Sequence, residues 1–185
     1  MTSNIVLIST FILIFFAIIG TKPSLIYAAV IRGTQGNDNL IGTPKDDTME
    51  GLRGNDKIDG LSGNDIIEGN QGKDLLNGSE GNDYLAGGQD DDVLNGGDGN
   101  DELNGEEGRD HLFGDLGNDV LYGGLSNDIL NGGEGNDRIY GGLGNDTLTG
   151  GPGGDYFDCG LGTDIVKDYN PAEGDSYVNC ETLSH

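Results

Sequence analysis

An aspartate recurs at every ninth position from Asp38 to Asp164 without interruption. An apolar residue follows each aspartate by two positions, from Leu40 to Val166, and glycine precedes it by five positions in fourteen of fifteen units, Cys159 being the exception. The nine-residue period therefore holds at the aspartate, the apolar and the glycine positions. Such a repeat predicts a stack of similar units, each packing on its neighbours, and not a wide globular core. The repeated aspartates are Asp38, Asp47, Asp56, Asp65, Asp74, Asp83, Asp92, Asp101, Asp110, Asp119, Asp128, Asp137, Asp146, Asp155 and Asp164.

Each unit combines a glycine-containing turn with a short strand. Glycine at the first and fourth positions is expected to permit positive φ. Asparagine precedes the aspartate in nine units, as at Asn55 and Asn64, and is expected to tolerate left-handed geometry there. The three residues after each aspartate, such as 93–95, are predicted to form the strand, with the middle residue pointing inward.

The strong negative charge limits the classes of partner. The chain has 33 acidic and 9 basic residues, a formal net charge of -24. This charge argues against nucleic acid and anionic membrane surfaces as partners. Glycine-rich, highly charged sequences are usually disordered, so a cation must offset the charge if the chain is to fold. His111 and His185 are the only histidines and no Cys/His cluster occurs, which favours calcium over transition metals. Magnesium is less favoured because it demands octahedral geometry and keeps its waters.

The pattern resembles the RTX (repeats-in-toxin), haemolysin-type calcium-binding nonapeptide repeat family, over about three quarters of the chain. The resemblance implies an all-β fold, a right-handed parallel β-roll of about fifteen nonapeptide repeats with a short C-terminal cap. It further implies that two nonapeptides form one coil, and that aspartates 18 residues apart bind Ca²⁺ between stacked turns together with turn carbonyls. All fifteen repeated aspartates are therefore candidate ligands.

Charge counting agrees with multiple calcium ions. Fifteen turns paired at this separation give 15 − 2 = 13 inter-turn sites. Thirteen Ca²⁺ ions would carry +26, against -25 for residues 30–185, which contain 33 acidic and 8 basic residues.

Some turns depart from the pattern. Lys45, Asp90 and Ser126 replace the second turn glycine. Lys45 and Asp90 are expected to resist positive φ, and Lys45 places a cation close to the ion. The turns of Asp47 and Asp92 are therefore predicted to be the weakest sites.

The N-terminal segment predicts export. Residues 5–19 are almost entirely apolar, and a stretch of small residues ends at Ala28 and Ala29. This pattern predicts a signal peptide over residues 1–29 and a secreted protein. An uncleaved membrane anchor is the alternative, although a spanning helix needs about 20 apolar residues. Both interpretations place the repeats of residues 30–167 outside the cytoplasm.

The period stops after Lys167, and residues 168–185 are predicted to cap the open end of the solenoid. Cys159 and Cys180 are the only cysteines. In an exported chain they predict one disulfide, which would stabilise the cap by about 3 kcal/mol in the entropic model. Two buried free thiols are the alternative.

These features predict a secreted calcium-binding repeat protein that folds when calcium neutralises its aspartates. The alternative is a calcium-stiffened cell-surface structural or adhesive protein with a surface or protein partner. Outward-facing strand residues are expected to stack in columns, or ladders. These ladders could form the patch that contacts such a partner, or could simply reflect the β-propensity of exposed strand positions. No enzyme is expected, because no catalytic motif occurs and fewer than 20 residues lie outside the signal and the repeats. The ladder residues are Leu75, Val93, His111 and Ile129 on one face, Ala86, Tyr122 and Tyr140 on the other, and Phe113 opposite them.

Overall fold

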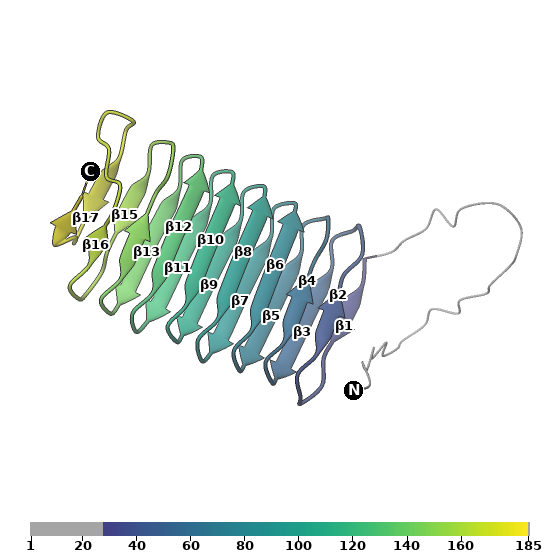
Figure 1. The fold of residues 1–185 in the computed structure, drawn as a ribbon. Coiled ribbons are helices and arrows are strands. Elements are labelled where there is room, and N and C mark those ends of the chain that lie inside the picture. Colours follow the sequence, from purple (N-terminus) through teal and green to yellow (C-terminus); the bar gives the residue numbers. More distant parts are fainter. Residues whose placement is uncertain (1–27, 185) are drawn as a thin grey trace, which may run out of the picture.

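The computed structural model describes residues 28–184, which form two nine-stranded parallel sheets (Figure 1). Successive strands alternate between the two sheets, so the chain winds as a flattened coil of about nine turns. This confirms the predicted all-β parallel β-roll, in which each coil uses two nonapeptides. Residues 1–27, which carry most of the predicted signal peptide, lie outside the described residues. Within residues 28–184, no helix is long and apolar enough to cross a membrane.

The first sheet contains the odd-numbered strands and the second contains the even-numbered strands. The first sheet consists of β1 (Val30–Arg32), β3 (Thr48–Arg53), β5 (Ile66–Gln71), β7 (Tyr84–Gln89), β9 (Glu102–Glu107), β11 (Val120–Leu125), β13 (Arg138–Leu143), β15 (Tyr156–Asp158) and β17 (Ser176–Val178). The second consists of β2 (Asn39–Ile41), β4 (Lys57–Asp59), β6 (Leu75–Glu80), β8 (Val93–Asp98), β10 (His111–Leu116), β12 (Ile129–Glu134), β14 (Thr147–Thr149), β16 (Ile165–Val166) and β18 (Thr182–Leu183).

The register of both sheets follows the repeat. His111 in β10 pairs with Val93 in β8 and with Ile129 in β12, so equivalent residues stack in straight columns. Leu75 and Ile129 in this column are 39% and 40% exposed, which confirms the outward-facing ladder expected here. Ala86, expected to face outward on the other sheet, is only 7% exposed, so that expectation was wrong.

The core is a thin double column of buried apolar side chains, one from each strand from β2 to β16. Leu94, Leu112 and Leu130 are fully buried, as are their counterparts in the other sheet. Burying one such side chain contributes about 1.5–3 kcal/mol, so each coil has only two main apolar contributions. The interactions at the polar edges of each coil therefore account for a large share of its stability.

The middle strands are longer than the three residues predicted. β10 spans six residues and continues through Gly114, Asp115 and Leu116, which were expected to belong to the turn. These residues pair with the neighbouring coils in register, Asp115 with Gly97 and with Gly133. The turn proper is consequently confined to the three residues that end at the aspartate.

The role expected for the first glycine of the unit was wrong. Positive φ occurs at the second and fourth positions, for example Glu106 at 72° and Gly108 at 158°, but not at the first. The first glycine is required for space instead. A Cβ at Gly105 would lie 2.5 Å from Oδ2 of Asp110 and 2.6 Å from the carbonyl oxygen of Gly123.

The coil continues beyond the last repeat. β17 pairs with β15, and β18 pairs with β16, so the C-terminal segment adds one further coil to the stack. The predicted disulfide between Cys159 and Cys180 is present, with sulfur atoms 1.99 Å apart. It joins this last coil to the repeat beneath it.

Candidate metal-binding edges

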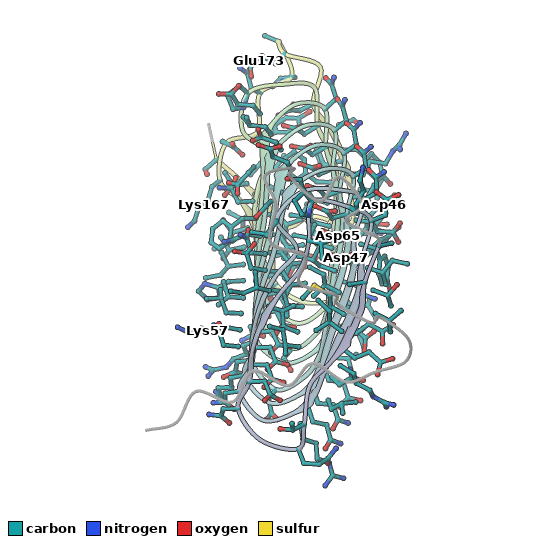
Figure 2. All side chains as sticks on the ribbon, turned by 90° about the vertical axis from the view of Figure 1, so that its right-hand side faces the viewer. Asp46, Asp47, Lys57, Asp65, Lys167 and Glu173 are labelled. Atoms are coloured by element: carbon teal, nitrogen blue, oxygen red, sulfur yellow. A yellow bond between two sulfur atoms is a disulfide. The ribbon has the colours of Figure 1, made fainter. Side chains whose placement is uncertain are left out.

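The repeated aspartates lie in two columns, one along each edge of the coil. The Asp56 edge comprises Asp38, Asp56, Asp74, Asp92, Asp110, Asp128, Asp146 and Asp164, and the Asp65 edge comprises Asp47, Asp65, Asp83, Asp101, Asp119, Asp137 and Asp155. All of them except Asp38 are at most 3% exposed. In Figure 2, Asp47 and Asp65 lie within the outline of the coil.

One carboxylate oxygen of each aspartate beyond the first coil is held by the neighbouring coil. The backbone N–H of Asp101 donates to Oδ1 of Asp119 at 2.8 Å, and the N–H of Asp119 donates to Oδ1 of Asp137 at 2.8 Å. The same bond repeats at 18-residue separation along both edges. The sequence did not suggest this ladder, which fixes each carboxylate in a single orientation.

The other oxygen, Oδ2, is buried without a partner in thirteen of the aspartates. Burial of a carboxylate oxygen without a compensating interaction is strongly unfavourable. These thirteen residues are those that have an equivalent aspartate 18 positions earlier, so the orphaned atoms match the number of inter-turn sites. They are Asp56, Asp65, Asp74, Asp83, Asp92, Asp101, Asp110, Asp119, Asp128, Asp137, Asp146, Asp155 and Asp164.

Burial dominates the electrostatics of these edges. Burial, with a smaller contribution from the charges of neighbouring aspartates, raises the pKa of Asp92 and of Asp128 to about 8. The pKa of Asp101 rises to about 7 for the same reasons. The backbone N–H bond of the ladder lowers each pKa but does not outweigh burial. Without a cation, the aspartates are therefore driven to take up protons.

The first two turns satisfy their carboxylates differently. The N–H of Thr34 donates to Oδ2 of Asp38 at 2.6 Å, and the N–H of Thr43 donates to Oδ2 of Asp47 at 2.5 Å. Each threonine hydroxyl also reaches the same carboxylate at 3.0 Å. Asp38 and Asp47 therefore have no orphaned oxygen, unlike the thirteen that follow.

The substituted turns divide into two groups. Lys45 does not adopt positive φ, as expected, whereas Asp90 and Ser126 adopt φ of 78° and 84°. The expectation that Asp90 would resist positive φ was wrong, because the short polar side chain tolerates the left-handed region. Whether the turns of Asp47 and Asp92 hold calcium least well stays a prediction.

A second ladder is formed by the residue before each aspartate. The N–H of Asn118 donates to Oδ1 of Asn100 at 2.7 Å, and the N–H of Asn136 donates to Oδ1 of Asn118 at 2.9 Å. Asn55 and Asn64 do not adopt positive φ, so the left-handed geometry expected for these asparagines was wrong. They serve instead to connect successive turns, in the direction opposite to the aspartate ladder.

Charged residues interrupt the asparagine ladder on the Asp56 edge. Lys73 and Arg109 both contact Asp91, at 2.5 and 3.1 Å, and their hydrogen bonds hold the pKa of Asp91 well below its ordinary value. Exposed pairs of this kind contribute little to stability.

The donor set of the edges suits a hard cation. Among residues 28–184, no three His, Cys, Asp or Glu side chains gather as a metal-binding group. A cation at an edge would be held by carboxylates of two stacked turns and by backbone carbonyl oxygens. Ca²⁺ accepts 6–8 oxygen ligands of this mixed kind, and the orphaned Oδ2 atoms fit it.

Comparison with curated proteins found no match. A family model described as the RTX calcium-binding nonapeptide repeat does match, in overlapping segments that together span residues 32–166, well over half of the chain. The segments are 32–67, 59–94, 68–103, 95–130, 104–139, 122–157 and 131–166. Both the repeat and the parallel coil are accounted for by this match, and the chain belongs to the RTX calcium-binding nonapeptide repeat family.

Proposed function

We propose that this chain is a secreted protein that binds Ca²⁺ along both edges of its coil and folds as it does so. The observation that carries the proposal is the row of thirteen buried Oδ2 atoms without a hydrogen-bond partner. A cation between stacked turns would compensate these atoms. Membership of a calcium-binding family supports calcium as that cation.

The energetics of the coil support coupling between binding and folding. Each coil buries few apolar side chains and brings carboxylates of successive turns together. When calcium is bound, it supplies the positive charge that these carboxylates lack. The free energy of binding then contributes to the free energy of folding. Extracellular calcium modules bind at about 10⁻⁴–10⁻³ M, so the chain would fold after export and not in the cytoplasm.

The aspartates have two tasks in this proposal. Oδ1 of Asp119 accepts the N–H of Asp101 and orients the carboxylate. Oδ2 of Asp119 is then directed into the turn, where it is available to a cation. The first glycine of each unit leaves the space that this atom occupies, as at Gly114 next to Oδ2 of Asp119.

Far-UV circular dichroism of residues 30–185 tests the proposal. We expect a disordered spectrum in EGTA and a β-sheet spectrum at millimolar calcium, with magnesium at the same concentration much less effective. A chain with full β-structure in EGTA at neutral pH would contradict calcium-dependent folding.

Secretion is supported by the disulfide between Cys159 and Cys180, since such bonds persist in oxidising compartments. N-terminal sequencing of the exported protein tests it. A start near Val30 supports a released protein, whereas an intact N-terminus on the cell surface supports the anchored alternative.

A calcium-stiffened adhesive protein is the second candidate, favoured by aromatic residues on the outer face of the first sheet. The rings of Tyr122 and Tyr140 stack with centroids 4.9 Å apart, and Tyr156 lies 6.0 Å from Tyr140. Leu125 and Leu143 are 44% and 48% exposed on adjacent strands. Catalytic activity forms no part of either proposal.

A further inference from the structure

The C-terminal coil closes both aspartate ladders with carboxylates from outside the repeat. On the Asp65 edge, the N–H of Asp155 donates to Oδ1 of Asp175 at 2.9 Å. On the Asp56 edge, the N–H of Asp164 donates to Oε2 of Glu181 at 3.0 Å. Asp175 and Glu181 thus occupy the positions that further repeats would have filled, although they lie 20 and 17 residues on and not 18.

The two closing carboxylates differ in the state of their second oxygen. Oδ2 of Asp175 accepts the N–H of Asn170 at 2.7 Å, so both oxygens of this buried side chain are bonded to backbone amides. At the other end of the coil, Asp47 is saturated in the same way by the N–H groups of Ala29 and Thr43, whereas Asp38 is bonded by the N–H and the hydroxyl of Thr34. Within residues 28–184, the only hydrogen bond from a donor group that reaches Glu181 is the one from Asp164. Glu181 therefore has an oxygen without a hydrogen bond that it can offer to a cation, whereas Asp175 has none.

Glu181 also lies against an aspartate that is itself unsatisfied. Asp164 is fully buried, and its Oδ2 has no partner. The backbone N–H of Asp164 donates to Oε2 of Glu181 at 3.0 Å, so the Glu181 carboxylate lies next to Asp164. The ion pairs among the described residues involve neither side chain. Two adjacent carboxylates, one of them in the protein interior, repel each other unless a cation lies between them.

We propose that Asp164 and Glu181 form one additional calcium site, contributed by the C-terminal coil and absent from the aspartate repeat. The proposal rests on the proposed calcium-binding function and extends it by one site, from 13 to 14 on the count of paired turns. Backbone carbonyls of residues 160–163 would supply further oxygens. Because Glu181 is exposed, water would complete the coordination shell, and this site fills at higher calcium concentrations than the enclosed ones.

The location gives the site a structural consequence. Glu181 directly follows Cys180, which the disulfide joins to Cys159 in the same unit as Asp164. The disulfide keeps the last coil near the stack, and the ion would fasten β18 onto β16. The end of the coil is then ordered only when calcium is present.

Hydrogen exchange monitored by mass spectrometry on the oxidised full chain tests this site, with calcium as the probe. The test variant is Glu181→Gln, whose amide oxygen can still accept the Asp164 N–H. The matched control is Glu173→Gln, which removes an exposed carboxylate from the same cap (Figure 2).

We expect calcium to protect residues 176–184 from exchange in the unmodified chain and in Glu173→Gln. In Glu181→Gln we expect protection of the repeats to remain and at least a tenfold loss of protection in this segment. Bound calcium at saturation should also fall by one ion per chain relative to the control. Unchanged protection and ion count in Glu181→Gln would overturn the additional site alone, whereas absence of any calcium-dependent protection in the repeats would overturn the proposed function as well.

Discussion

The backbone N–H of Asp101 donates a hydrogen bond of 2.8 Å to Oδ1 of Asp119, while Oδ2 of Asp119 is buried without a partner. One carboxylate therefore connects two coils through one oxygen and keeps the other oxygen free. The same arrangement repeats along both edges. It is absent from Asp47 and Asp175, whose two oxygens both accept backbone N–H groups, and from Asp38, which is bonded by the N–H and the hydroxyl of Thr34.

Asp119→Asn separates the two roles of the carboxylate. The amide keeps an oxygen for the Asp101 N–H but loses the charge and one anionic oxygen. We expect the calcium midpoint measured by circular dichroism to rise at least twofold and the cooperativity to fall. Asp38→Asn is the control, because Thr34 already occupies Oδ2 of Asp38. Equal effects of the two substitutions would contradict the distinction between central and terminal turns.

Acid should partly replace calcium. Burial raises the pKa of Asp92 from an ordinary value of 3.8 to about 8 and that of Asp101 to about 7, so the coil binds more protons than the unfolded chain does. Stability from this source is fully present below pH 3.8 and is lost as the pH rises through 7 and 8. In EGTA we therefore expect more β-structure at pH 4.5 than at pH 8.5, measured by circular dichroism. The opposite order would contradict the buried state of these carboxylates.

Protons and calcium should also compete for the same atoms. Because binding requires deprotonated carboxylates, the calcium midpoint should rise as the pH falls from 8 to 6. Isothermal titration calorimetry in buffers of different ionisation enthalpy should detect proton release on calcium binding. Binding without proton release at pH 6 would show that Asp92 and Asp128 are not among the titrating ligands.

Adjacent positions of one repeat unit should respond to substitution in opposite directions. Gly105→Ala places a methyl group 2.5 Å from Oδ2 of Asp110, and we expect it to lower stability by about 2 kcal/mol or to weaken calcium binding. Glu106→Gly removes a non-glycine residue from φ of 72°, and we expect stabilisation by about 1 kcal/mol. Thermal unfolding at saturating calcium measures both. Equal destabilisation by the two changes would argue against the different roles of these positions.

Reduction of the Cys159–Cys180 disulfide should loosen only the end of the coil. The bond joins residues 21 positions apart, for which the entropic model gives about 3 kcal/mol. We expect dithiothreitol to increase hydrogen exchange in residues 168–184 and to leave β7 to β11 unchanged at saturating calcium. Loss of protection throughout the coil would show that the disulfide supports the whole stack.

The coil could be predicted from the sequence because the nine-residue repeat shows directly where the apolar and the acidic residues of each unit must lie. An apolar residue must point inward once per strand and an acidic residue must lie at each turn, and both constraints recur at the same spacing. Leu112 and Asp110 could therefore be placed from the sequence alone. The disulfide was also predictable, because the chain has only two cysteines and its N-terminal residues predict export.

Other features depend on contacts between coils, which spacing within one unit does not reveal. The need for glycine at Gly105 comes from Asp110 and the next coil, and Gly105 does not adopt positive φ. The asparagine ladder likewise joins Asn118 to Asn100 in another coil. Glu181 was missed because it lies 17 and not 18 residues after Asp164, so the strict period excluded it.

The most direct test of the account is an anomalous difference map from crystals grown with calcium. We predict peaks along both edges, each about 2.3–2.6 Å from the Oδ2 atom of a buried aspartate such as Asp119, with none bound to Asp38 Oδ2 or Asp175. A folded coil at neutral pH without peaks at Oδ2 of Asp101 and Asp119 would contradict the account.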